Sequence, residues 1–303
     1  MKIASIDAKQ YIELISKDYK QLRDQDRNVV PSRVFTLNID KAAVLAKGII
    51  PKGMDSLVVD QMKIRLLKGG LEKKDLALLD LLVTNNWERP IYMNHTSLSQ
   101  INIDLSPYAV QEGNAYRILP VKNPRKDREY LVDTERSYDI MLNKFHYRGL
   151  DNEKIYYTED YRGFVVNHRS SLNSLAQALI DEGKMAKADS VLLFSLAKMP
   201  DKAIKYDHTT PETIDLLFQV GEKDKALEVS KILGDRADKM ATYLISEGYG
   251  LTTELRRNIF VLNALQRTLY ENGDEELAKK FEDAYNRLVA GLQIRGQLPQ
   301  EDR

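Results

Sequence analysis

Two short segments of the chain hold most of the side chains that could recognise a ligand. The first, residues 85–95, contains the only tryptophan, and the second is residues 111–117. Tryptophan and tyrosine rings offer flat apolar area with a polar group, and arginine offers a rigid fork of hydrogen-bond donors. Surfaces of this composition can bind a sugar or a peptide. The candidate binding residues are Trp87, Arg89, Tyr92, Glu112, Tyr116 and Arg117.

The same residues also fit a purely structural role, which such side chains have more often than a binding role. In that interpretation the tryptophan anchors a core, the arginines pair with nearby glutamates, and proline and glycine set turns. The residues concerned are Trp87, Arg89, Arg117, Glu88, Glu112, Pro90 and Gly113. Both interpretations remain open from the sequence.

Other sequence patterns that could indicate a catalytic or metal-binding site are weak. Asp24 and Asp26 form an Asp-x-Asp pair that could bracket a divalent cation, but Arg23 and Arg27 flank it. We therefore expect the charge-balanced, solvated end of a helix there. The four histidines do not have zinc-site spacing, and the chain has no cysteine, phosphate-binding loop or nucleophile elbow. We predict no catalytic residue, no cofactor and no metal site.

Composition limits the class of protein. The 303 residues are enough for roughly two domains, and 45 basic side chains balance 45 acidic ones. A nucleic-acid-binding protein normally carries a basic excess, so we predict no nucleic-acid partner. No apolar run approaches the roughly 18 residues that span a bilayer, so the chain itself is not expected to insert into a membrane.

The first half, residues 1–160, has the pattern of an α+β domain. Helical spacing of apolar residues begins at Tyr11, and Asp40 is a good N-cap for a short helix through Ala46. Residues 75–84 predict a buried helix, and residues 138–145 a further helical segment. Residues 34–37, 57–66, 91–93, 115–119 and 155–157 favour extended structure.

The second half, residues 161–303, predicts an all-α repeat array of the tetratricopeptide type. Three segments each place glycine five residues before alanine, with an apolar helix before the glycine and an amphipathic helix after the alanine. Glycine permits the positive φ that ends a helix, and the small alanine permits close packing of the next helix. Hairpins of this kind bury their apolar faces only by stacking. The pairs are Gly183 and Ala188, Gly221 and Ala226, and Gly273 and Ala278.

Several separated motifs, in order, resemble one protein family. The resemblance rests on residues 32–35, 40–41, 44–45, 75–80, 85–92, 111–117 with Pro120, 141–145 and 149–151. These motifs are similar to those of a family of multi-pass bacterial membrane proteins, abundant in the Bacteroides group and grouped with protein O-mannosyltransferase-like glycosyltransferases. Residues 146–148, His-Tyr-Arg, differ from the Trp-Gly-Gly that the family pattern would have.

The resemblance implies a soluble periplasmic region of a larger membrane enzyme, whose catalytic acids belong to the membrane bundle. Met1 would then not be the native start. The expected partners are an acceptor or partner protein on the helical array, and the parent membrane domain. Two alternatives remain: a stand-alone cytoplasmic tetratricopeptide adaptor, if Met1 is the true start, and a soluble enzyme or carbohydrate-binding module centred on Trp87 and Arg117.

Overall fold

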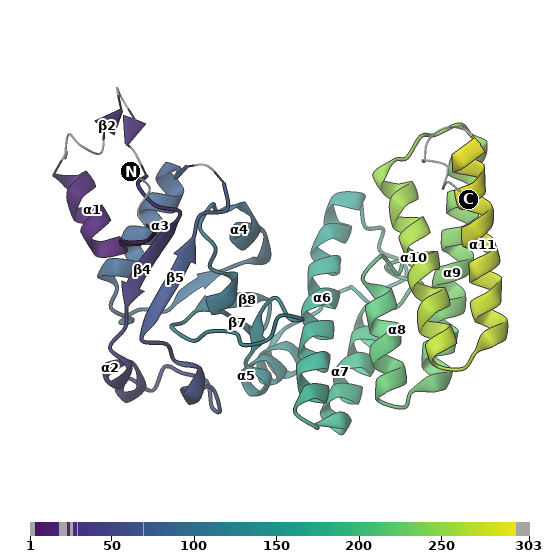
Figure 1. Cartoon of the computed structure of the whole chain (residues 1–303). Helices are drawn as coiled ribbons and strands as arrows, with labels where there is room; N and C mark the ends of the chain where they lie inside the picture. Colours follow the sequence, from purple (N-terminus) through teal and green to yellow (C-terminus); the bar gives the residue numbers. More distant parts are fainter. Residues whose placement is uncertain (1–3, 18–22, 25–26, 29, 69, 295–303) are drawn as a thin grey trace. The chain divides into compact units, whose positions relative to one another are not determined.

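A computed structural model describes residues 4–17, 23–24, 27–28, 30–68 and 70–294. The chain divides into two compact units, residues 1–140 and 141–303. The first unit combines sheets and helices, and the second is a run of helices (Figure 1). This arrangement confirms the predicted fold class, a mixed first part followed by an all-helical part. The sequence places the domain boundary at residue 160.

The first sheet of the first unit has three strands in the order β1-β4-β5. Strand β1 (Ile6–Asp7) pairs in parallel with β4 (Val34–Asn38), and β4 pairs antiparallel with β5 (Gln61–Arg65). Helix α1 (Ala8–Ser16) follows β1 and packs Tyr11 against Phe35 of β4, with ring centroids 5.2 Å apart. The predicted opening helix is confirmed, and its role is to cover this sheet.

A hairpin of β2 (Arg23–Asp24) and β3 (Arg27–Asn28) lies between α1 and β4. The predicted helix end at the Asp-x-Asp pair is wrong, because α1 ends at Ser16 and Asp24 belongs to a strand. The remaining residues of that pair's motif, Gln25 and Asp26, lie outside the described residues.

The short helix α2 (Lys41–Ala46) begins as predicted. The Asp40 carboxylate accepts a hydrogen bond from the Ala43 N–H at 3.0 Å, which satisfies one of the N-terminal donors that a helix leaves unpaired. A 3₁₀ turn, η2 (Asp55–Leu57), then leads into β5.

The second sheet has four strands in the order β6-β8-β7-β9. They are β6 (Ile91–Met93), β7 (Ala109–Glu112), β8 (Ala115–Ile118) and β9 (Leu131–Val132). Strand β8 is antiparallel to both neighbours, whereas β7 and β9 are parallel. Gly113, with φ 68°, begins the two-residue turn between β7 and β8, a position that favours glycine in such hairpins.

Four further helical segments and one 3₁₀ turn belong to the first unit, and the last of them continues past its boundary at residue 140. Helix α3 (Lys73–Thr84) is confirmed, although Leu81 is exposed rather than buried. The others are α4 (His95–Gln100), η3 (Ser106–Tyr108), α5 (Thr134–Tyr138) and the π-helical segment η4 (Asp139–Lys144). Residues 155–157, for which the sequence favours an extended segment, belong to no strand.

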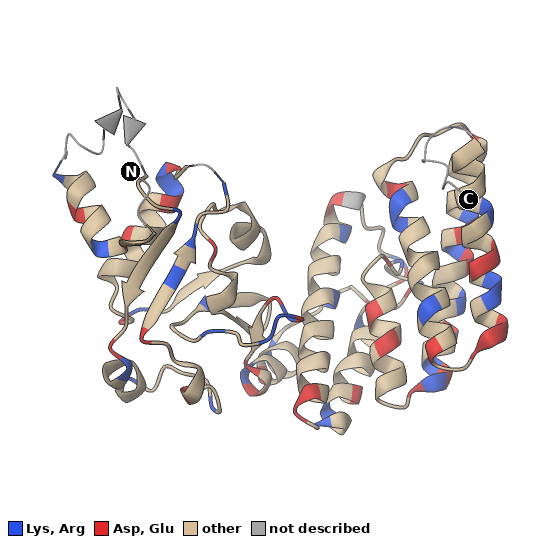
Figure 2. Ribbon diagram, viewed as in Figure 1, with Lys and Arg blue, Asp and Glu red and all other residues tan. Residues whose placement is uncertain are grey.

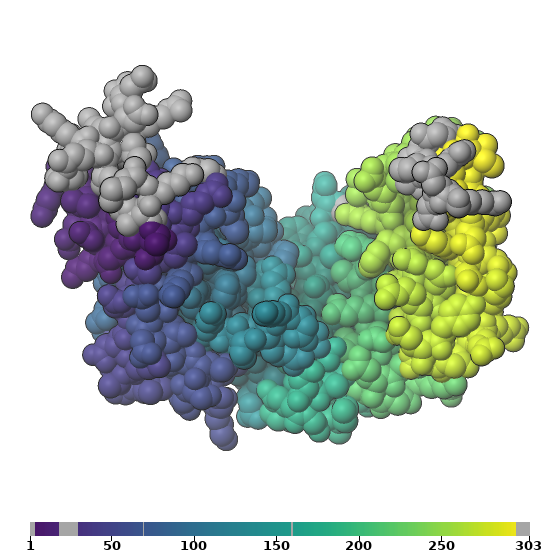
Figure 3. All heavy atoms as spheres, in the orientation of Figure 1, coloured from purple at the N-terminus to yellow at the C-terminus, as the bar shows by residue number. Residues whose placement is uncertain are grey.

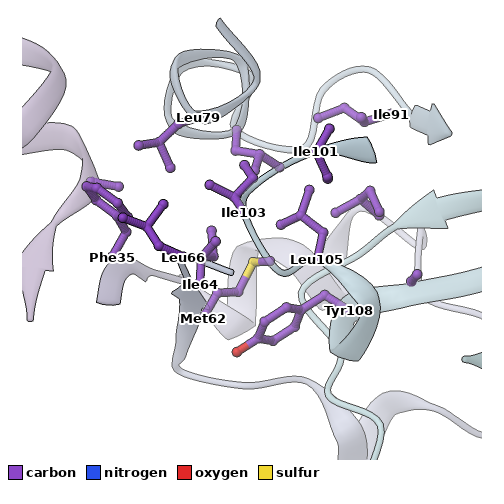
Figure 4. Packing of buried hydrophobic residues seen from close by; sticks show 14 of the residues in the cluster. Phe35, Met62, Ile64, Leu66, Leu79, Ile91, Ile101, Ile103, Leu105 and Tyr108 are labelled. Carbon is purple, nitrogen blue, oxygen red and sulfur yellow. The ribbon is translucent and has the colours of Figure 1, made fainter. Parts of the chain in front are cut away.

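The main core of the first unit joins the two sheets to α1 and α3 (Figure 4). Phe35, Met62, Ile64, Leu79 and Ile103 are fully enclosed within it. A second, smaller hydrophobic cluster contains Val44, Val58, Val110, Leu119 and Val121.

A buried carboxylate secures the edge of the main core. Asp75 is fully buried at the first turn of α3, where its two oxygens accept hydrogen bonds from the N–H groups of Glu72 and Asn102, both at 2.8 Å. Asp75 therefore links the start of α3 to the segment that follows α4. These two hydrogen bonds give the buried carboxylate a structural role.

The second unit contains six helices in the described range. They are α6 (Glu159–Asp181), α7 (Met185–Lys198), α8 (Thr210–Gln219), α9 (Lys223–Ser246), α10 (Thr253–Glu271) and α11 (Glu275–Ile294). Each packs against its neighbours in the chain, and α6 also contacts α8, α8 contacts α10, and α9 contacts α11. This is a stack of successive hairpins.

The predicted glycine turns are confirmed. Gly183, Gly221 and Gly273 have φ values of 73°, 92° and 76°. The residue after each glycine donates its N–H back into the last helical turn, for example Lys184 to the Leu179 carbonyl at 2.8 Å. That is the Schellman pattern of a helix end. The alanines five residues later are fully buried, as close helix packing requires.

Arg169 of α6 holds the connection between α7 and α8. Its side chain is 4% exposed, and its guanidinium donates to the carbonyls of Met199, Ile204 and Lys205 and pairs with Asp207 at 2.5 Å. A connection without regular structure is thereby fixed by one multidentate cation.

Helix α11, whose atoms are yellow in Figure 3, has an exposed side that is mostly polar. Apolar residues of α11 such as Phe281 and Leu288 are buried, while its exposed side carries Lys279, Lys280 and Arg287.

Candidate functional site

Strand register brings three of the six candidate residues onto one face of the second sheet. Tyr92 of β6 lies opposite Arg117 of β8, and Arg117 lies opposite Val110 of β7. Glu112 is two residues beyond Val110. Because side chains alternate between the faces of a strand, Tyr92, Arg117 and Glu112 all lie on the Val110 face.

Glu112 is the centre of the resulting cluster. Its side chain is only 2% exposed. One carboxylate oxygen is 3.4 Å from Nη1 of Arg117, and the other accepts a short hydrogen bond from the Tyr92 hydroxyl. The second oxygen also lies 2.9 Å from Nε of Arg136. Two cations and a hydroxyl thus satisfy this buried charge, as the cost of burying an isolated carboxylate requires.

Arg136 is a member of the cluster that sequence reasoning missed. It lies in α5, whose Asp133 N-cap accepts from the Arg136 N–H at 3.0 Å. Ser137 holds the helix on β7: its hydroxyl donates to the Gln111 carbonyl at 3.1 Å and accepts from the Gly113 N–H at 3.0 Å. The Asp133 cap signal could have located α5, but nothing in the sequence placed it beside Glu112.

The cluster has a buried base and an exposed rim. Arg117 is 13% exposed, whereas Arg136 is 51% exposed and Tyr92 is 41% exposed. Nε of Arg117 is buried and makes no hydrogen bond within the described structure. Burial raises the pKa of Tyr92, and its bond to Glu112 raises it further. Tyr92 therefore stays protonated and acts as a donor.

Tyr116 lies on the opposite face of the sheet. Its ring is buried, 4.4 Å from that of Tyr130 and 6.4 Å from that of His95, between ring centroids. It belongs to the main core rather than to the cluster around Glu112. Three aromatic groups packed in this way serve stability.

Trp87 and Arg89 lie in the loop between α3 and β6. Trp87 is half-buried and packs against both hydrophobic clusters of the first unit. Asn86 and Trp87 both have positive φ, 44° and 60°, a conformation that is strained for a tryptophan. Arg89 is exposed.

Two neighbours hold this strained loop in place. The Asn85 side chain donates to the Arg89 carbonyl at 2.7 Å and accepts from the Arg89 N–H at 3.2 Å. Lys47 donates to the Asn86 carbonyl at 2.6 Å and pairs with Glu88 at 2.5 Å. The structural interpretation paired Arg89 and Arg117 with Glu88 or Glu112. Glu88 instead pairs with Lys47, the residue that follows α2, whereas Arg117 does pair with Glu112.

The arrangement supports hydrogen bonding and charge pairing. Arg136 supplies the donors that reach the surface, and Glu112 orients both Arg136 and the Tyr92 hydroxyl that donates to it. Over the residues that the structure describes, no three histidine or acidic side chains come together as a metal site. None of its described helices has the length and apolar character to cross a membrane.

The first part of the chain is similar to a described protein family. Residues 2–136 match the family described as TMEM260-associated domain 2, a range that includes both sheets and every residue of the Glu112 cluster. No curated protein and no solved structure matches the chain. The match is consistent with a domain that is associated with a TMEM260-like membrane protein.

Proposed function

We propose that this chain is a non-catalytic accessory region of a membrane-bound, protein O-mannosyltransferase-like glycosyltransferase, located on the periplasmic side. The observation that carries the proposal is the match of residues 2–136 to a domain associated with a membrane protein. In this proposal the first unit belongs to the parent protein's characteristic accessory domain, and the chemistry resides in the membrane-embedded part.

The helical unit serves to bind an acceptor or partner protein. Its stacked hairpins, with glycine turns and buried alanines, support a tetratricopeptide-like array. Arrays of this kind offer extended surfaces on which another polypeptide can lie. Tyr243 of α9 is 55% exposed, so its ring is open to contact with a partner.

Fractionation of native cells tests the membrane association. An antibody raised against this chain should detect, in the inner-membrane fraction, a band well above the 34.8 kDa of the chain itself. A band near that mass in the soluble fraction would instead favour a stand-alone adaptor and would contradict the proposal.

Site-specific photo-cross-linking tests the binding role. A photo-reactive amino acid in place of Tyr243 should link the protein to one partner in intact cells. The same residue in place of Leu81, which is exposed on α3 of the first unit, serves as the control. Equal labelling from both positions, or none from Tyr243, would count against partner binding by the array.

A further inference from the structure

Helix α10 has two faces of opposite character. One face is buried in the array by leucines and a valine at helical spacing: Leu255, Val261, Leu262, Leu265 and Leu269. At 3.6 residues per turn, positions 256, 260, 267 and 271 fall on the other side, with 257 at its margin. This second side faces away from the core and is exposed.

The exposed side of α10 is basic and has an aromatic ring at its centre. It carries Arg256, Arg257 and Arg267 against one acidic residue, Glu271, with Phe260 between them. The Phe260 ring is 55% exposed. An exposed aromatic ring among cations offers a partner apolar contact and positive charge at one place.

The charges of this face are not neutralised within the array. Arg256 donates from Nε to the Leu251 carbonyl at 3.1 Å. Within the described part of the chain, Arg257 and Arg267 make no ion pair. By contrast, the outer basic residues of α11 are paired: Lys280 with Asp235 at 2.5 Å, and Arg287 with Asp238. Figure 2 shows this intermixing of charges on α11.

We propose that the exposed face of α10 binds an acidic segment of a partner polypeptide that also carries apolar side chains. Phe260 would cover an apolar side chain, and the planar forks of Arg257 and Arg267 would each hold a carboxylate. This inference rests on the proposed role of the array in partner binding, and it names the chemistry of the partner.

Two labelled peptides test the proposal on the full chain. In the first probe, fluorescein-labelled, glutamates alternate with phenylalanines, and in the second, glutamines replace the glutamates. Fluorescence anisotropy should show binding of the glutamate peptide at least about tenfold tighter than of the glutamine peptide, with a preference that declines as salt is added.

Variants of the face and a matched control locate the site. The double change Arg257→Glu and Arg267→Glu should weaken binding of the glutamate peptide by more than about tenfold and favour a peptide with lysines in the same places. Phe260→Ser should weaken both original peptides. Arg287→Glu changes an exposed arginine that Asp238 already pairs, and it should alter binding by less than about twofold.

Either of two results would overturn the inference: equal affinity for the glutamate and glutamine peptides, or an equal loss from Arg287→Glu. Far-UV circular dichroism of every variant checks that the fold is intact, which is expected because all four positions are exposed. If cross-linking from Tyr243 captures a partner while the peptide preference is absent, the partner-binding role stands and only the acidic chemistry fails.

Discussion

Gly234 of α9 lies directly against the aromatic ring of Phe281 in α11. A Cβ atom at Gly234 would overlap the Cζ, Cε1 and Cε2 atoms of that ring, closer than real Cβ atoms approach other atoms. Phe281 is itself fully buried. The missing side chain therefore allows the buried ring of Phe281 to lie against the backbone of α9.

The first prediction concerns this contact. Gly234→Ala should lower the free energy of unfolding by about 1–3 kcal/mol, because overpacking a filled core outweighs the helix propensity that alanine adds. Gly291→Ala is the matched control, since its Cβ would meet nothing within 4 Å, and it should be neutral or stabilising by up to about 1 kcal/mol. Urea unfolding followed by far-UV circular dichroism measures both. Equal effects of the two changes would show that the contact is not tight.

Trp87→Ala should lower the free energy of unfolding by about 3 kcal/mol or more, because Trp87 packs against both clusters of the first unit. Arg89→Ala, two residues away in the same loop but exposed, should change it by less than about 0.5 kcal/mol. Because Trp87→Ala removes the only tryptophan, tryptophan fluorescence cannot report its unfolding. Far-UV circular dichroism measures the unfolding of both variants. A stable Trp87→Ala protein would contradict the role of Trp87 as a structural anchor.

Glu112→Gln should destabilise the first unit by about 3 kcal/mol or more, because it leaves the largely buried Arg117 without its counter-charge. Tyr92→Phe removes one hydrogen bond at the exposed rim and should cost about 1 kcal/mol. The double variant Glu112→Gln with Arg117→Met tests the cause, since removal of both charges should recover part of the loss. Failure to recover any of it would mean that the pairing of these charges is not what Glu112 contributes.

Burial raises the pKa of Asp133 above its ordinary value of 3.8, against the bond from the Arg136 N–H that lowers it. A raised carboxyl pKa means that the folded state holds the proton more tightly than the unfolded state. Asp133 therefore favours folding when protonated, and this contribution falls as pH rises from the unfolded pKa through the folded one. Asp133→Asn keeps a capping oxygen without the charge. Its stability relative to the natural protein should increase as pH rises through that window, as measured by thermal unfolding at a series of pH values. A difference that is constant with pH would contradict the raised pKa.

The sequence by itself determined the elements whose conformation depends on a few neighbouring residues. The glycine turns at Gly183, Gly221 and Gly273 and the cap at Asp40 were predictable for this reason, since a helix end needs a specific φ or acceptor within one turn. The buried alanines followed from the same repeat. The sequence left Glu88 and Glu112 as alternative partners for the arginines, and the turn between β7 and β8 is what brings Glu112 to Arg117.

Only the tertiary structure decided which candidate residues meet. Sheet order and register place Tyr92 beside Glu112 and send Tyr116 to the opposite face, and α5 brings Arg136 to them from outside both sequence motifs. The contact of Gly234 with Phe281 likewise joins distant residues. These relationships arise because the packing of strands and helices depends on the total apolar surface that they bury together. That total depends on residues throughout the unit. The sequence around any one of these residues therefore does not determine which distant residues it contacts.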